Sequence, residues 1–306
     1  MRKEFPGGVW PVMLTPFKEN GEVDYRGLEA LVNWYIEKEV DGLFAVCQSS
    51  EMFYLSLDER IKISRKVVEI AAERVPVIAS GHISNTLREQ ADEIMRIAET
   101  GVDAVILITN RLAKEEEGDE IWLENCKKLI CMIDADIPLG FYECPYPYKR
   151  VLSAENIKWC ADTGRFFFLK DTCCDARQIQ EKLKVLKGTQ LKLYNANTAT
   201  LLESLRGGAA GYSGVMANFH PELYEWLCKN KNNKKADSVS DILSMCALIE
   251  KQFYPVNAKW GLREIEHLPI TDVCRAKNSS GMTETFNKEI RMMDRVVKRT
   301  AEYLKR

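Results

Sequence analysis

A lysine ends an apolar stretch of this sequence, Arg165–Asp171, which reads RFFFLKD. The run of large apolar residues before Lys170 predicts a strand buried on both faces, as in a parallel sheet covered by helices. Burial disfavours the protonated amine, and a neutral lysine amine is a nucleophile that condenses with carbonyl compounds. The simpler interpretation is a solvated lysine where a strand meets water, and the fragment alone favours it. The surrounding elements decide between the two.

Groups that would assist such a lysine follow other predicted strands. Tyr142 ends the preceding strand, Ile137–Tyr142, and a phenol there can move protons to and from a carbinolamine and an imine. Ser49 and Ser50 follow an earlier strand, and their hydroxyl and backbone N–H groups can hold a carboxylate. Together these residues predict an imine-forming site for a 2-oxo acid. The alternatives are packing for the tyrosine and turn or cap hydroxyls for the serines.

The elements that must position these residues alternate along the chain. Eight short apolar runs predict strands at Val9–Leu14, Gly42–Val46, Val75–Ser80, Ala104–Thr109, Ile137–Tyr142, Phe166–Lys170, Leu191–Asn195 and Ala210–Gly214. Apolar residues at three- and four-residue spacing predict helices between them at Tyr25–Lys38, Leu57–Glu73, Thr86–Thr100, Asp119–Asp134, Ala154–Asp162, Asp175–Leu186 and Thr198–Arg206. Asp24 and Ser153 are predicted helix N-caps, as is Asn197.

This order predicts an α/β fold, a closed (β/α)8 TIM barrel over residues 1–219 whose active site lies at the C-terminal ends of the strands. An open doubly wound sheet is the alternative, but no GxGxxG follows the first strand, so the usual dinucleotide signature is missing. Beyond residue 219 the strand pattern stops. Residues 220–306 are predicted to form a helical extension packed on the barrel, including helices at Pro221–Cys228, Ala236–Phe253 and Thr283–Leu304.

Composition excludes several classes of partner. The chain has 306 residues with a formal net charge of −2, which gives no support for nucleic acid or an anionic membrane surface as partner. No apolar run approaches the roughly 18 residues that a membrane span needs. Ten cysteines without a CxxC pair predict free thiols in a reducing compartment, and therefore a cytoplasmic protein. Three histidines without ligand spacing, and no convergent carboxylates, predict no metal site and no cofactor.

The order and spacing of several motifs resemble one family over nearly the whole chain. The motifs are the serine pair with Glu51, Tyr142-x-x-Pro145, Lys170, and the segment that begins at Gly211 and reads GYSGVMAN. The chain is similar to the dihydrodipicolinate synthase / N-acetylneuraminate lyase superfamily of class I, Schiff-base-forming aldolases and lyases. The resemblance implies an enzyme acting on pyruvate or another 2-oxo acid, assembled as a homo-oligomer, a dimer or a tetramer.

The resemblance also implies roles for single positions. Lys170 would form the Schiff base, and Tyr142 would transfer protons. Ser49 and Ser50 would bind the carboxylate of the 2-oxo acid, and the backbone at Tyr212 and Ser213 would line the pocket near the imine. Glu51 would be structural, a ligand of its own loop.

The departures from the family concern the second substrate. Gln48 stands where synthase members have a relay threonine, and is interpreted as a contact to substrate or to Tyr142. Asn110, Arg111 and Leu112 replace the segment with the family's inserted tyrosine, and Pro147 takes the place of a carboxylate-binding arginine. The sequence therefore predicts a divergent member, with the second substrate and the reaction, aldol cleavage, condensation or dehydration, left open. Substrate contacts of His82, Lys149 and Arg150 are open as well.

Two other functions compete with this prediction. A barrel acting on a phosphorylated substrate would use glycines near strand eight, such as Gly211 and Gly214. A degenerate member would bind a 2-oxo acid without turnover.

Overall fold

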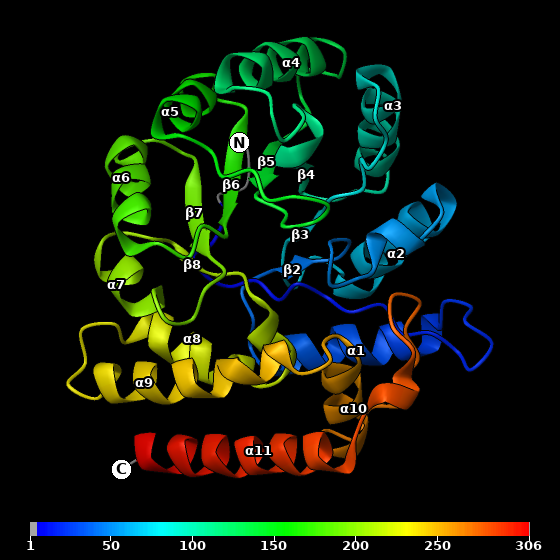
Figure 1. The fold of residues 1–306 in the computed structure, drawn as a ribbon, viewed down its shortest axis with the longest axis vertical. Coiled ribbons are helices and arrows are strands. Elements are labelled where there is room, and N and C mark those ends of the chain that lie inside the picture. The colour runs from blue at the N-terminus through cyan, green and yellow to red at the C-terminus, as the bar shows by residue number, and fades with distance from the viewer. Residues whose placement is uncertain (1–4, 306) are drawn as a thin grey trace.

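The chain forms a closed barrel of eight parallel strands. The structure, a computed structural model, describes residues 5–305. The strands pair in the order β1-β8-β7-β6-β5-β4-β3-β2, and Val12 beside Phe44 joins the two ends of this sheet (Figure 1). They are β1 (Gly8–Val9), β2 (Leu43–Phe44), β3 (Val77–Ala79), β4 (Ala104–Ile108), β5 (Leu139–Tyr142), β6 (Phe166–Asp171), β7 (Lys192–Asn195) and β8 (Gly211–Tyr212). The predicted TIM barrel is confirmed.

Two local features explain how the barrel closes at β1. The regular strand is shorter than the predicted Val9–Leu14 because Pro11 has no N–H to give to a neighbouring strand. The Pro11 carbonyl still accepts from the Phe44 N–H at 3.1 Å. On the other side of β1, a Cβ on Gly211 would lie 1.8 Å from the carbonyl oxygen of Gly8, so glycine is required where β8 meets β1.

The barrel interior is filled by aromatic side chains. Phe168 stacks on Tyr194 with ring centroids 4.1 Å apart, and Trp10 meets the Phe168 ring edge-on at 5.2 Å. All three rings are fully buried. This packed aromatic layer fills the barrel beneath the strand ends.

An outer ring of helices covers the strands (Figure 1). Its members are α1 (Tyr25–Glu37), α2 (Leu57–Ala71), α3 (Leu87–Ala98), α4 (Asp119–Cys131), α5 (Ala154–Asp162), α6 (Ala176–Leu186), α7 (Leu201–Arg206) and α8 (Pro221–Lys229). Asp24 and Ser153 cap α1 and α5 as predicted. Asn197 instead holds the turn before α7, since its side chain accepts from the Thr200 N–H, and the helix begins at Leu201.

The remaining chain forms a C-terminal extension, residues 236–304. It contains α9 (Ala236–Cys246), the short 3-10 helix η4 (Ala247–Lys251), α10 (Val256–Glu264) and α11 (Glu284–Leu304). The extension gathers on the side of the barrel that carries α1, α7 and α8 (Figure 1). Helix α8 packs on β1 and β8 as the eighth helix of the barrel. The expected boundary between residues 219 and 220 lies before this helix and would assign it to the extension. Within residues 5–305, no helix is both long and apolar enough to cross a membrane.

Candidate active site

Lys170 and Tyr142 lie side by side at the mouth of the barrel. Strands β5 and β6 pair with these two residues in register, at or next to the end of each strand. The Nζ atom of Lys170 lies 4.1 Å from the centre of the Tyr142 ring and 6.0 Å from that of Phe44. The predicted lysine–tyrosine pair is therefore formed by strand register, and the contact runs over the face of the phenol ring.

Burial sets the proton affinity of both groups. Both side chains are about 4% exposed. Burial lowers the pKa of the Lys170 amine to about 8, against the opposing influence of the nearby Cys47, Cys144 and Glu250. Burial likewise raises the pKa of the Tyr142 phenol well above its usual value. Near neutral pH a sizeable fraction of the amine is free base, while the phenol keeps its proton. A nucleophile and a proton donor thus coexist in one place.

Gln48 holds the hydroxyl end of Tyr142. Its Oε1 atom accepts from the Tyr142 hydroxyl at 3.4 Å and from the Cys144 thiol at 3.5 Å. Of the two interpretations offered for Gln48, the structure shows the contact to Tyr142. Gln48 also lines the cavity, so a contact between its amide nitrogen and the substrate stays a prediction.

The two serines after β2 have different places. Ser49 lines the cavity, and its hydroxyl lies near the Tyr254 phenol, where it opposes the rise that burial gives the pKa of that phenol. Ser50 does not line it: its hydroxyl is fully buried and donates toward the Met13 and Ala45 carbonyls, at 2.6 and 3.0 Å. Ser50 therefore shapes the turn in which Ser49 sits, and only Ser49 is placed to meet a substrate.

Tyr212 and Ser213 lie behind the cavity wall. The Tyr212 ring stacks on Tyr224, with centroids 4.1 Å apart, and Ser213 is fully buried. The two residues that follow, Gly214 and Val215, line the cavity instead. A Cβ on Gly214 would lie 2.3 Å from the Tyr212 hydroxyl, so a glycine here lets the chain pass over that ring.

A buried ion network supports the two reactive residues from behind. Lys182, on α6, bonds Asp171 Oδ2 and Glu143 Oε1, and these carboxylates directly follow Lys170 and Tyr142 in sequence. Glu143 also accepts the backbone N–H of Thr172 at 2.9 Å. Burial alone would lower the pKa of Lys182, but the two carboxylates raise it above its usual value. We call Lys182, Glu143 and Asp171 the floor network, because one ammonium ties the ends of β5 and β6 together.

Glu51 joins the loop after β2 to the extension. Its Oε1 accepts from the fully buried Lys259 ammonium at 2.8 Å. Its Oε2 accepts the backbone N–H groups of Arg275 and Ala276 at 2.6 and 2.7 Å. The structural role that the family resemblance implied for Glu51 agrees with these contacts.

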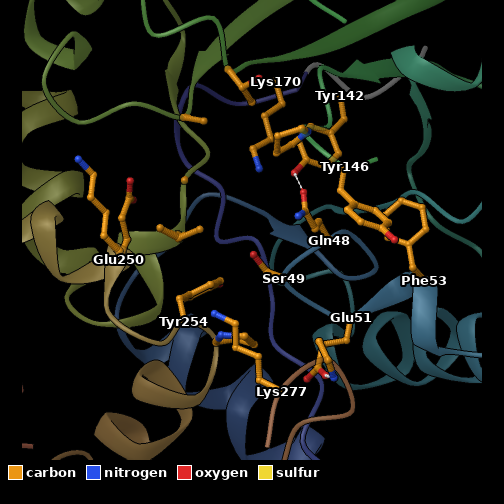
Figure 2. Close-up of a pocket in the computed structure, with 18 of the residues that line it drawn as sticks. Gln48, Ser49, Glu51, Phe53, Tyr142, Tyr146, Lys170, Glu250, Tyr254 and Lys277 are labelled. Atoms are coloured by element: carbon orange, nitrogen blue, oxygen red, sulfur yellow. Dashed lines mark hydrogen bonds between the residues drawn. The ribbon is translucent and has the colours of Figure 1, made fainter. Parts of the chain in front are cut away.

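A cavity of about 530 Å³ opens above Lys170 and Tyr142. Figure 2 shows these two side chains on one side of it, Tyr254 and Lys277 on the other, and Ser49 between. Phe53 and Tyr146, with ring centroids 4.9 Å apart, form a further wall. The extension supplies Glu250, Lys251, Tyr254, Pro255, Ala276 and Lys277 to the lining. Sequence reasoning missed these residues, since no local pattern shows which part of a helical tail returns to the barrel mouth.

Other candidate residues lie outside the cavity. His82 is fully buried, with Nδ1 3.1 Å from Gln90 Oε1 and Nε2 accepting the Ile108 N–H at 2.6 Å. Lys149 donates to the Thr172 carbonyl at 2.8 Å, and Arg150 donates to the Lys114 carbonyl at 2.7 Å. These bonds give all three side chains structural roles.

Comparison with known proteins agrees with this geometry. The model of the dihydrodipicolinate synthetase family matches residues 5–289, nearly the whole chain. The chain belongs to this family. It is thereby an enzyme of the Schiff-base aldolase and lyase type. The predicted family and enzyme class are confirmed.

Individual members of the family are distant. A 4-hydroxy-tetrahydrodipicolinate synthase of Coxiella burnetii is 26% identical over 270 residues, covering 86% of this chain and 89% of its own. One from Methanococcus aeolicus is 30% identical over 239 residues, with 77% and 79% covered. The chloride-inhibited dihydrodipicolinate synthase of Acinetobacter baumannii, solved with pyruvate, superposes with a TM-score of 0.84 at 23% identity, covering 96% and 99%. This family member is thus divergent in sequence while its fold is shared.

Proposed function

We propose that this protein forms a Schiff base between Lys170 and pyruvate or a related 2-oxo acid, and uses it to make or break a C–C or C–O bond. The observation that carries the proposal is the buried Lys170 amine, 4.1 Å from the Tyr142 ring centre at the base of the cavity. Its pKa of about 8 supplies free amine at neutral pH.

Each step of imine formation has a group to support it. The amine adds to the ketone carbon, and the resulting carbinolamine must lose its hydroxyl as water. The Tyr142 phenol, protonated at neutral pH, is the proton carrier for both events, and Gln48 holds its oxygen. The protonated imine then withdraws electrons from the neighbouring carbon, which stabilises the carbanion that aldol cleavage, condensation or dehydration passes through.

We assign the carboxylate of the 2-oxo acid to Ser49. Its hydroxyl faces the cavity between Lys170 and Tyr254 (Figure 2). Ser50 supports this contact through the turn, with its own hydroxyl directed at the Met13 carbonyl. Hydrogen bonds to an ionised acceptor are the stronger kind, which suits a group that fixes one end of a small substrate.

We do not extend to this protein the activity named for the Coxiella and Methanococcus relatives. Pro147 offers no cation where synthase members carry an arginine. The neighbouring Lys149 and Arg150 are held by backbone carbonyls away from the cavity. The second half of the substrate must therefore meet different groups.

The test is borohydride trapping with pyruvate, followed by peptide mass spectrometry. A reduced pyruvyl adduct on Lys170 is the expected result. An adduct that forms only with a longer 2-oxo sugar acid would move the proposal to a sugar-acid lyase or dehydratase. No adduct with any oxo acid would contradict it.

Two expectations about the setting accompany the proposal. All ten cysteines are free thiols, which supports a reducing compartment such as the cytoplasm. The homo-oligomer, dimer or tetramer, stays a prediction that light scattering of the purified protein would check.

A further inference from the structure

The extension forms one face of the cavity, opposite the reactive lysine. Glu250, Lys251, Tyr254 and Lys277 belong to it, and we call them the mouth face. Figure 2 shows Glu250, Tyr254 and Lys277 across the open space from Lys170. A substrate bound as an imine to Lys170 must extend its remaining chain toward these residues.

Buried contacts fix the backbone of the mouth face. The N–H groups of Arg275 and Ala276, next to Lys277, bind Glu51. The Tyr254 hydroxyl accepts from Asn218 Nδ2 at 3.1 Å, and Asn257 Nδ2 donates to the Ile249 carbonyl at 2.9 Å, just before Glu250. The face is therefore a preformed part of the site, and its charged side chains start from fixed Cα positions.

Its two ammonium groups have no carboxylate of their own. Among residues 5–305, neither Lys251 nor Lys277 forms an ion pair, and Lys277 rests over the Phe253 ring at 5.3 Å. Glu250 is half-buried; burial raises the pKa of its carboxyl, and the nearby Lys251 and Lys170 oppose that rise. The other acid on the lining, Glu51, already accepts hydrogen bonds from Lys259 and two backbone N–H groups.

We propose that the mouth face binds the distal half of a substrate whose hydroxylated chain ends in a second anion, a carboxylate or a phosphate. This rests on the Schiff-base function proposed above. Lys277 and Lys251 receive the anion, because their charges are unpaired and reach the cavity. Glu250 repels an anion and accepts hydrogen bonds, so it receives a hydroxyl group from the middle of the chain.

Size supports a substrate longer than pyruvate. The cavity of about 530 Å³ lies within the range of roughly 300–1,000 Å³ typical of pockets for drug-sized ligands, which are much larger than a three-carbon acid. Phe53 and Tyr146 lie together on one side of the path from Lys170 to Lys277 (Figure 2). The site thus favours an extended chain with charge at both ends.

The test uses the aldol direction, in which the methyl carbon of pyruvate forms a bond to an aldehyde carbon and the aldehyde oxygen becomes a hydroxyl. Three matched aldehydes are compared with pyruvate as partner: glyceraldehyde, glyceraldehyde 3-phosphate and tartronate semialdehyde. We expect kcat/KM for at least one anionic aldehyde to exceed that for glyceraldehyde by about tenfold or more. The phosphate and carboxylate arms identify which anion is preferred.

Variants assign the effect to the mouth face. Lys277→Gln, alone or with Lys251→Gln, is expected to lower kcat/KM for the anionic aldehyde about 10- to 100-fold, the scale of one lost charge-assisted hydrogen bond. The value for glyceraldehyde should change little. Lys234→Gln, in the exposed loop between α8 and α9, is the matched control.

The outcomes separate this proposal from the one it rests on. Trapping on Lys170 is measured in every sample with pyruvate and with longer 2-oxo acids, and failure with all of them in wild-type protein would contradict the Schiff-base function. If trapping succeeds, equal kcat/KM values for neutral and anionic aldehydes would overturn the mouth-face proposal. The proposal would also be overturned if no condensation occurred with the anionic aldehydes, or if the variants lowered kcat/KM equally for all three aldehydes.

Discussion

Two regions of this site are built in opposite ways: the mouth face, and the side of the cavity that carries Lys170 and Tyr142, which we call the floor. On the floor, Lys170 and Tyr142 are buried and stand in strand register, and the floor network fixes the residue after each. On the mouth face, Lys251 and Lys277 are exposed and have no ion-pair partner within residues 5–305. The floor can therefore change little without loss of the fold, whereas the mouth face can change its side chains at small cost to stability. We therefore expect substitutions on the mouth face to alter substrate preference and substitutions at Lys170 or Tyr142 to abolish or slow the reaction.

The strongest test of the floor is Lys170→Ala. No other lysine is buried beside Tyr142 in the described chain, so we expect imine formation with pyruvate to be abolished. Borohydride trapping and mass spectrometry measure the loss, with circular dichroism as the control for folding. Trapping at the wild-type level would remove the central role of Lys170.

Tyr142→Phe removes one hydroxyl and keeps the ring that packs edge-on against Phe44. We expect the exchange of the pyruvate methyl protons with deuterated solvent to slow by about 10²–10⁴, the contribution of a positioned proton-transfer group. Proton NMR follows this exchange without the second substrate. An unchanged rate would show that another group carries the proton.

Lys182→Met tests the floor network. The variant leaves Glu143 and Asp171 as buried carboxylates without a counter-charge, and we expect a loss of about 3–5 kcal/mol in the free energy of unfolding. Urea denaturation measures it. The control is Lys184→Met on the exposed face of the same helix, where the change should be small. A stable Lys182→Met protein would mean that β5 and β6 are held by their backbone pairing alone.

The pH dependence of trapping tests the burial of Lys170. The free amine is the nucleophile, and its pKa is about 8. The initial trapping rate should therefore rise with pH, by at most about tenfold per unit below pH 8, and level off above it. A rise that continues to the ordinary lysine value, above pH 10, would indicate a solvated amine.

The smallest expected effect is that of a mouth-face substitution on stability. Lys277→Gln should change the free energy of unfolding by about 0.5 kcal/mol or less, because an exposed side chain loses only its contact with the Phe253 ring. Urea denaturation in parallel with Lys182→Met gives the contrast. A loss as large as that of Lys182→Met would place the mouth face in the structural core.

The sequence could predict what local patterns determine. The alternation of strands and helices fixed the barrel, and the strand ends located Lys170 and Tyr142. Ser50 and Tyr212 show the limit, because a hydroxyl or a ring beside the site can be directed inward by packing that only the fold reveals. Glu250 and Lys277 show another, since they reach the cavity through contacts such as Lys259 with Glu51, 208 positions apart. The spacing of apolar residues along the chain does not indicate which distant residues pair.

The contacts of Glu51 bear on how this family could exchange specificities. Through Glu51, the turn that carries Ser49 and the segment that precedes Lys277 share one carboxylate. Arg275 adds a second attachment, pairing with Glu59 of α2 at 2.6 Å. An extension transplanted from a relative to alter the substrate would have to bring a lysine equivalent to Lys259 and keep the length of the segment up to Ala276. We expect a chimera that breaks these contacts to displace Ser49, and with it the proposed contact to the carboxylate of the 2-oxo acid.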